Sequence, residues 1–401
     1  MTEKTKQRIW SKDFILIFGV GLMTSIGMQT LNATMSIYAN SLGASATFSG
    51  LMATSFAVAA VIMRLVSGRY SDLRGRRLTM VIGAAIFAVA VYAFGIFAIL
   101  PGLLIFRAVQ GIGFSVVSTS AAAAIVDVTP KKQLGEGIGY YGLGISLAMA
   151  IGPAIGLPLA SSGNFLTLYL IIGSLAVLGV IFSLFCTYEK RLHLFEREPA
   201  ETGVDSTGIW KVIEKSAIPA SITYLVCTLA TSSVVAFLPP YAQKQGYDNI
   251  AMFFILGAAA MFIARLFTGR IYDRKGPLFV LIPSLLGSAL SFALIAVVSG
   301  ELAFLAIGIL YGFTLGMTLP AFNALAVRHS PVHRRGAASA TFNLCVDVGI
   351  GLGSFIWGLV IDGTGSFLWI FIGSAICMIV ALAMSLLLFR KAQPSIEINL
   401  Q

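Results

Sequence analysis

Residues 64–75 read Arg-Leu-Val-Ser-Gly-Arg-Tyr-Ser-Asp-Leu-Arg-Gly, and residues 265–276 read Arg-Leu-Phe-Thr-Gly-Arg-Ile-Tyr-Asp-Arg-Lys-Gly. The second stretch follows the first by 201 positions, with Arg, Leu, Gly, Arg, Asp and Gly in the same register. Because this spacing is half of the 401-residue chain, it indicates two copies of one unit. Both copies lie between apolar runs long enough to span a bilayer, a pattern that is typical of transporters built from internal repeats.

Two further matches support the duplication. The segment 129–135, with Thr-Pro and a later glycine, matches 330–336, with Ser-Pro and a later glycine, again 201 positions away. The segment 38–43, with Tyr-Ala and a later glycine, matches 241–246 at a spacing of 203. Similar spacings at separate places indicate that the whole unit is repeated.

The composition places the chain in a membrane. Hydrophobic residues make up 57% of it and charged residues only 11%, whereas soluble domains carry about 25% charged residues. The net charge is +10, but the basic residues lie in short clusters between apolar runs, which argues against nucleic-acid binding.

Apolar runs of roughly 20 residues, the length of a membrane-spanning helix, predict an all-α membrane protein with two pseudo-symmetric bundles of six helices. The twelve predicted helices are 14–39, 47–67, 78–99, 101–126, 138–160, 165–187, 214–240, 250–268, 278–298, 301–327, 337–361 and 366–389. The polar stretch from Tyr188 to Trp210 predicts a linker, so the expected parts are a first bundle (1–187), a cytoplasmic linker (188–212) and a second bundle (213–401).

The lysines and arginines predict the orientation. If both termini are cytoplasmic, 25 of the 27 basic residues lie in cytoplasmic loops or at cytoplasmic helix ends. Only Lys244 then lies outside, and only Arg107 lies well inside the membrane. Residues 1–13 are polar and the next apolar run is too long for a signal peptide, so we expect the first helix to be retained in the cell membrane.

Few residues indicate metal, cofactor or enzyme chemistry. The cysteines at 186, 227, 345 and 377 lie in apolar segments and are expected to be packing residues. Neither the cysteines nor the three histidines show metal-ligand spacing, and no Walker loop, acid pair or nucleophile–base pair is evident. We therefore expect no metal, no cofactor and no enzymatic activity, and interpret Gly349–Gly353 as a helix-packing stretch.

Three stretches resemble motifs of the major facilitator superfamily. Residues 68–77, Gly-Arg-Tyr-Ser-Asp-Leu-Arg-Gly-Arg-Arg, resemble its G-x-L-a-D-R-x-G-R-R loop between helices two and three. Residues 107–113, Arg-Ala-Val-Gln-Gly-Ile-Gly, resemble the R-x-x-q-G-x-g motif of proton-coupled members. Residues 139–156, which include Gly-Pro at 152–153 and glycine at 156, resemble the motif of drug and metabolite antiporters.

The resemblance covers the whole chain and implies a twelve-helix transporter that works by alternating access. It implies export of a small drug-like molecule or metabolite in exchange for protons. The expected partners are therefore a small-molecule substrate, protons and the lipid bilayer, and the expected oligomeric state is a monomer.

For the loop after helix two, the resemblance implies a conformational switch at Gly68, Asp72 and Arg76. Arg76 is expected to bridge to Asp127, and Asp72 to contact the start of helix eleven near Gly336–Ala338, where free N–H groups favour an anion. These contacts would hold the halves together while the cavity opens outward. The alternative is a solvated turn that only fixes the orientation.

The duplication extends these expectations to the second half. Asp273, the counterpart of Asp72, is expected to contact the region of Gly137. Helices five and eleven are expected to pack tightly where the halves meet, because their glycines correspond at a spacing of 201. The interface residues of these two helices are Gly152, Pro153, Gly156 and Gly353.

Two charged residues are candidates for proton coupling. Asp347 is the only carboxylate near mid-membrane and shares a helix face with Ser339 and Asn343. Burial disfavours the charged form of a lone carboxylate, which suits reversible protonation; binding a cationic substrate and a purely structural role are the alternatives. Arg107 lies roughly 9 Å into helix four, and the resemblance implies that it tunes proton binding; snorkelling to the outer headgroups is the alternative.

Helices one, four, seven and ten are expected to line the substrate cavity. The residue candidates are Gln29, Asn32, Gln110, Tyr224, Asn323, Phe342 and Asn343. Rival functions are a nutrient symporter or facilitator, a lipid or glycolipid flippase on the same fold, and a membrane sensor without transport. The few polar groups inside the membrane weigh against a sugar transporter, which would need many hydrogen bonds.

Overall fold

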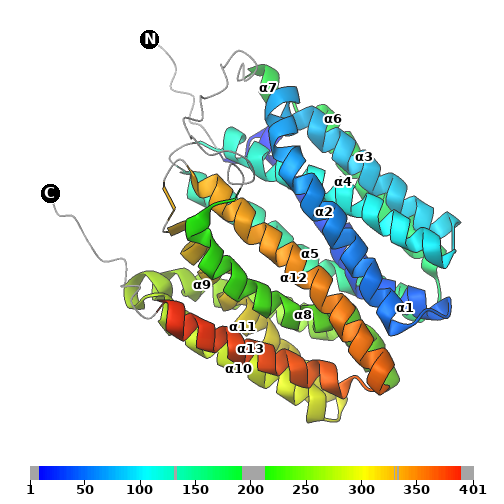
Figure 1. Cartoon of the computed structure of the whole chain (residues 1–401). Coiled ribbons are helices and arrows are strands. Elements are labelled where there is room, and N and C mark those ends of the chain that lie inside the picture. Colours follow the sequence, from blue (N-terminus) through cyan, green and yellow to red (C-terminus); the bar gives the residue numbers. More distant parts are fainter. Residues whose placement is uncertain (1–8, 131–132, 192–212, 329, 332–333, 390–401) are drawn as a thin grey trace.

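The structure is a computed structural model that describes residues 9–130, 133–191, 213–328, 330–331 and 334–389. Within these residues it contains no strand and twelve helices that are long and apolar enough to cross a membrane (Figure 1). The all-α prediction with twelve transmembrane helices is confirmed. Their bounds are α1 Lys12–Ser41, α2 Ala46–Arg74, α3 Arg76–Ile96, α4 Leu100–Val128, α5 Leu134–Ser161, α6 Phe165–Phe185, α8 Ile218–Lys244, α9 Ile250–Lys275, α10 Pro277–Val297, α11 Glu301–Arg328, α12 Arg335–Thr364 and α13 Leu368–Phe389.

Only the short helix α7 (Tyr188–Arg191) represents the predicted linker among the described residues. Most of that linker, and the histidines at 193, 329 and 333, lie outside them. The division into two bundles with the predicted boundaries stays a prediction. All four cysteines are free thiols, in line with their expected packing role.

Helices α2 and α9 each continue seven residues beyond their predicted ends at 67 and 268. The prediction that residues 68–77 form a loop was wrong, because a single glycine costs a helix only about 1 kcal/mol and the charged residues do not break it. The turn is made by one residue in each copy, Gly75 with φ 94° and Gly276 with φ 87°. A positive φ of this size favours glycine, which explains why both copies carry it there.

The two sets of helices, α1–α6 and α8–α13, have the same internal packing. In the first set, α1 packs on α5, α3 packs on α4 and α6, and α2 packs on α4. The second set repeats these contacts in the same order: α8 packs on α12, α10 packs on α11 and α13, and α9 packs on α11. The Tyr38 hydroxyl donates to the Phe94 carbonyl at 3.0 Å, and the Tyr241 hydroxyl donates to the Ile295 carbonyl at 2.9 Å. The repeat in the sequence is therefore a repeat in the fold.

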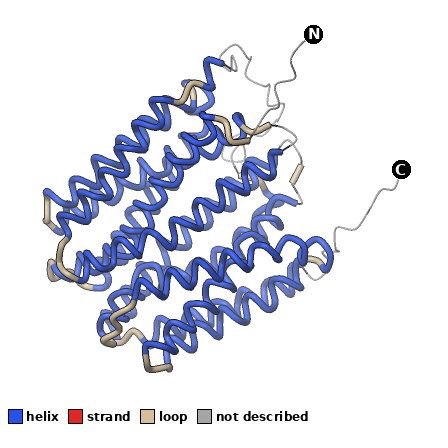
Figure 2. Tube along the Cα trace, turned by 180° about the vertical axis from the view of Figure 1, so that it is seen from behind, coloured by secondary structure: helices blue, strands red, loops and turns tan. Residues whose placement is uncertain are grey.

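The two sets meet along α2 with α12, α5 with α9, and α1 with α8 (Figures 1 and 2). The prediction that α5 and α12 pack against each other was wrong: each crosses to a different helix of the other set. The glycines that were predicted to form this contact lie against helices of their own set instead. Gly152 lies against α1 at Thr30, and Gly353 lies against α8 at Leu229.

Consecutive helices run antiparallel, so α1 begins and α13 ends at the same end of the molecule, which we term the terminal end. At the opposite end the sets are fastened together: the backbone N–H groups of Ala46 and Thr47 donate to the Asp362 carboxylate at 3.0 and 2.7 Å. Further hydrogen bonds that join the two sets lie between this end and mid-helix. The structure is thus closed at the end opposite the termini.

Candidate functional site

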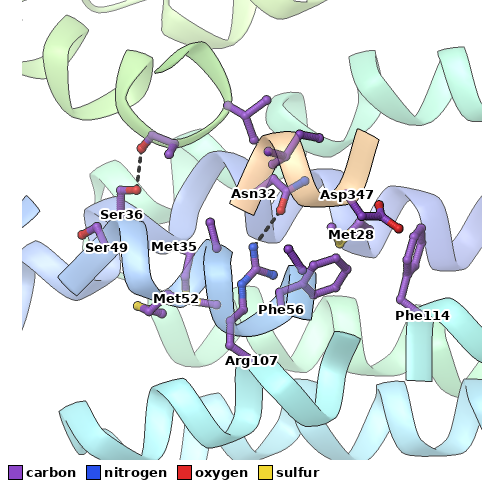
Figure 3. Close-up of a pocket in the computed structure, with 15 residues that line it drawn as sticks. Met28, Asn32, Met35, Ser36, Ser49, Met52, Phe56, Arg107, Phe114 and Asp347 are labelled. Atoms are coloured by element: carbon purple, nitrogen blue, oxygen red, sulfur yellow. Dashed lines mark hydrogen bonds between the residues drawn. The ribbon is translucent and has the colours of Figure 1, made fainter. Parts of the chain in front are cut away.

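A central cavity lies where the two sets meet (Figure 3). Residues of α1, α2, α4, α8 and α12 line it, among them Asn32, Phe56, Arg107 and Asp347. Helices one, four and seven of the predicted lining are present as α1, α4 and α8. Helix ten, α11, contributes nothing to this cavity; α2 and α12 take its place because their interface closes one side of the cavity.

Arg107 is the centre of a polar network beside this cavity. Its side chain is only 3% exposed, so it faces the protein interior rather than the headgroups. One terminal nitrogen donates to Gln110 Oε1 at 2.6 Å and the other to Asn32 Oδ1 at 2.7 Å, while Asn32 Nδ2 donates to Gln29 Oε1 at 3.3 Å. The guanidinium also stacks over Phe56, 5.0 Å from the ring centre. The fold therefore brings four predicted residues into one network.

Arg107 keeps unsatisfied hydrogen-bonding capacity. Its Nε and the Nε2 of Gln110 are buried without a hydrogen-bond partner. Both partners of its terminal nitrogens are neutral amides, so its charge is solvated but not neutralised. A buried arginine in this state favours the approach of an electron-rich group.

The repeat shows that the fold does not require this network. At the spacings of 201 and 203, Gln29, Asn32, Arg107 and Gln110 correspond to positions in the second set. Those positions hold Ser232, Val235, Gly308 and Tyr311. The matching helices pack together there without any charged or amide side chain, so the polar network is an addition to the repeated unit.

Asp347, on α12, reaches across to Arg64, on α2. The carboxylate Oδ2 accepts from Arg64 Nε at 3.1 Å and lies 2.9 Å from the terminal nitrogen NH2. Asp347 also lines the central cavity. The pair joins residues 283 positions apart and fastens the two sets of helices together in this conformation.

Arg64 is one of the residues that sequence reasoning missed. It was assigned to the cytoplasmic helix ends, but it lies ten residues before the end of α2, roughly 15 Å along the helix axis. The sequence did mark Arg64, because it is the first residue of the repeated stretch. Its partner could not be inferred because the pairing depends on how α2 crosses α12.

The remaining cavity candidates lie apart from the cavity lining. Tyr224 and Phe342 are buried and stack on each other with ring centres 4.9 Å apart. Asn343 Nδ2 donates to the Ser339 carbonyl at 2.9 Å. Asn323 is half-buried on α11. In this conformation these residues pack the second set.

Of the predicted switch residues, Arg76 and Asp127 are paired, and Arg76 also donates to the Ala123 carbonyl at 2.7 Å. The side chain of Asp72 and the surroundings of Gly68 lie outside the described part of the structure. Asp273 is exposed, and no hydrogen bond joins it to Gly137 among the described residues.

The interface residues of α5 pack against α1. A Cβ on Gly152 would lie 2.7 Å from the Thr30 nitrogen, and one on Gly156 would lie 2.5 Å from the Thr30 Cγ2. Pro153, between them, is buried. These close approaches hold α5 on α1, and they leave the opposite face of α5 to meet α9.

The comparisons with known proteins agree with this architecture. The family model described as the Major Facilitator Superfamily matches residues 17–354 and 276–400. The chain is 25% identical to the staphylopine export protein of Staphylococcus aureus, over 95% of this chain and 96% of that protein. It is 24% identical to a multidrug resistance efflux pump, the PmrA homologue of Lactococcus lactis, over 97% of each.

Among solved structures, a POT family transporter in complex with a thioalcohol-conjugated peptide has the same fold. The TM-score is 0.75 at 15% identity, covering 94% of this chain and 96% of that one. The chain therefore belongs to the major facilitator superfamily and is a multi-pass membrane transporter of small molecules rather than an enzyme.

Proposed function

We propose that the protein exports a small organic molecule in exchange for protons, and that Asp347 carries the proton. The observation that carries this proposal is the Arg64–Asp347 pair, which joins the two sets of helices and lines the central cavity. The two relatives named above, an export protein and an efflux pump, support export.

The pair couples protonation to conformation. Ionised Asp347 attracts Arg64 and holds α12 against α2, whereas a neutral carboxyl loses the charge that makes this attraction strong. If both termini are cytoplasmic, the closed end is extracellular, and the structure faces inward. In this state Asp347 has released its proton to the cytoplasm, and the cavity is ready for substrate. Opening to the outside separates the pair and lets Asp347 take up a proton there.

Substrate and proton then need only modest preferences between two states of similar energy. The Arg107 network lies in the same cavity, so substrate bound there and the charge of Asp347 influence each other directly. This arrangement makes exchange possible without a covalent intermediate or a nucleotide.

The test measures proton movement in proteoliposomes that contain a pH-sensitive dye. Xanthene dyes of opposite charge and a neutral dye serve as trial substrates, with wild type, Asp347→Asn and Asp248→Asn. Asp248→Asn is the matched control, because that carboxylate is exposed and lies outside the cavity. We expect substrate-driven proton movement in wild type and the control, and none in Asp347→Asn.

Asp347→Asn alone leaves Arg64 with an unpaired positive charge. The double variant Arg64→Gln, Asp347→Asn removes that charge as well, and it should also lack proton movement. Substrate flux without proton movement, unchanged in Asp347→Asn, would refute antiport and return Asp347 to a structural role. Substrate and protons moving in the same direction would show a symporter instead.

A further inference from the structure

The second copy of the Arg64 site lacks its carboxylate. Arg265, on α9, is the counterpart of Arg64, and Ser146, on α5, is the counterpart of Asp347, both at a spacing of 201. Arg265 reaches across to α5, where it donates to Ser146 Oγ and, at 3.4 Å, to the Gly142 carbonyl. The second copy of the interface thus has the arginine that extends to the other set of helices, but it lacks the carboxylate that pairs with this arginine in the first copy.

Arg265 is left with an unbalanced charge. It lies ten residues before the end of α9, roughly 15 Å along the helix axis, and is partly buried. Its Nε is buried without a hydrogen-bond partner. No carboxylate pairs with it among the described residues, and a hydroxyl and a carbonyl solvate a guanidinium without neutralising it.

The helix interiors as a whole carry excess positive charge. In the described helices, four charged residues lie at least seven positions from either helix end: Arg64, Arg107, Arg265 and Asp347. One carboxylate neutralises one of these guanidiniums. The other two have only neutral partners, and charges of one sign inside a membrane protein are costly unless a counter-charge arrives.

We propose that the substrate is an organic anion and that Arg265, with Ser146, binds its carboxylate or a similar oxyanion. A guanidinium presents N–H donors in a planar fork that matches a carboxylate, and Nε is the donor that remains available here. The Ser146 hydroxyl, which donates to the Gly142 carbonyl at 3.1 Å in this conformation, lies beside it and can turn to donate to a bound anion. This inference rests on the proposed transport function and adds the charge class of the substrate.

The test compares two xanthene dyes of opposite charge, 5-carboxyfluorescein and rhodamine 123, in the proteoliposomes described above. Arg265→Gln removes the charge, Arg265→Lys keeps it, and Ser146→Asp supplies the carboxylate that the first copy has. Arg270→Gln, an exposed arginine on the same helix, is the matched control. Binding of each dye to the purified protein is measured alongside flux.

We expect wild type to prefer carboxyfluorescein. Arg265→Gln should lower its flux relative to rhodamine by at least about tenfold, since a charge-assisted hydrogen bond is lost. Ser146→Asp should have the same effect, because its carboxylate would pair with Arg265 as Asp347 pairs with Arg64. Arg265→Lys should retain most of the preference, and Arg270→Gln all of it.

Three results would overturn the inference. Proton-coupled flux of rhodamine without binding of carboxyfluorescein would refute the anion assignment and leave the proposed antiport intact. Equal slowing of both dyes by Arg265→Gln would show that Arg265 only fastens α9 to α5. If the Arg265 variants changed chloride binding but left the dye preference unchanged, the site would be assigned to an inorganic anion.

Discussion

Gly50→Ala should shift the protein out of the conformation seen here. Gly50, on α2, lies against the α12 backbone near the closed end, and a Cβ at this position would lie 2.2 Å from the Ser354 carbonyl oxygen and 2.8 Å from its carbon. The contact joins the two sets of helices, so it exists only while this end is closed. The added methyl group therefore penalises the closed state and leaves the state that is open at this end unaffected.

The size of the effect follows from the distance. Separating the Cβ and the oxygen to an ordinary contact needs a displacement of about 1 Å between two backbones, and overpacking of this kind costs about 1–3 kcal/mol. A coupling of that size changes an equilibrium by about 5- to 150-fold. A transporter keeps its two states close in energy, so a shift of this size changes which state dominates.

The assay is a distance measurement by electron–electron double resonance in detergent or nanodiscs. Spin labels are attached at Ser162 and Gln245, two exposed positions at the closed end. These positions flank the hydrogen bond between Gln243 Nε2 and Ser161 Oγ (3.4 Å), which joins the two sets. The four native cysteines are replaced first. Gly50→Ala should convert the short distance of wild type into a longer one.

Gly363→Ala is the matched control, because Gly363 is on α12 at the same end and a Cβ there would contact nothing within 4 Å. It should leave the distance distribution unchanged. A folded Gly50→Ala protein with the wild-type distribution would refute the reasoning, since α2 and α12 would then not approach as closely as the structure places them.

Two other predictions concern the terminal end of the helices. Asp72→Asn should impair transport while leaving the melting temperature and topology at wild-type values, and normal flux would rule out the switch role of Asp72. Burial raises the pKa of the Glu214 carboxyl, but hydrogen bonds from Ser216 and the Arg334 guanidinium outweigh burial and hold that pKa below its ordinary value of 4.5. The stability from this pair is present above the unfolded-state pKa and is lost as the pH falls through the folded-state pKa. Wild type should therefore lose more thermal stability than Glu214→Gln between about pH 5 and pH 3, and parallel melting curves would contradict this role of the pair.

Much of the site could be found from the sequence because charge inside a membrane is rare. Arg107 and Asp347 stand out against apolar neighbours, and helical spacing places Arg107 and Gln110 near each other. Asn32 and Gln29 were identified by the same contrast. Their shared network could not be deduced, because it depends on how α1 lies against α4.

Errors arose where a residue's role depends on contacts across the interface. Arg64 and Arg265 lie near clusters of cytoplasmic charge in the sequence, and only the crossing of α2 with α12 and of α9 with α5 shows that they face the other set. The expected contact between α5 and α12 failed for the same reason. Corresponding glycines in a duplicated chain occupy equivalent sites, and equivalent sites need not touch.

The sequence by itself determined the twelve helices and the duplication, because bilayer thickness sets the length of an apolar run and a repeated unit leaves repeated residues at one spacing. It also determined the family, because the loop glycines and charges keep their order along the chain. Only the tertiary structure decided that Asp347 has a cationic partner and that Arg265 has no anionic one within the part of the chain that the structure describes. An ion pair forms through space between helices far apart in the chain, and the relevant difference between the two copies is one side chain, aspartate in one and serine in the other.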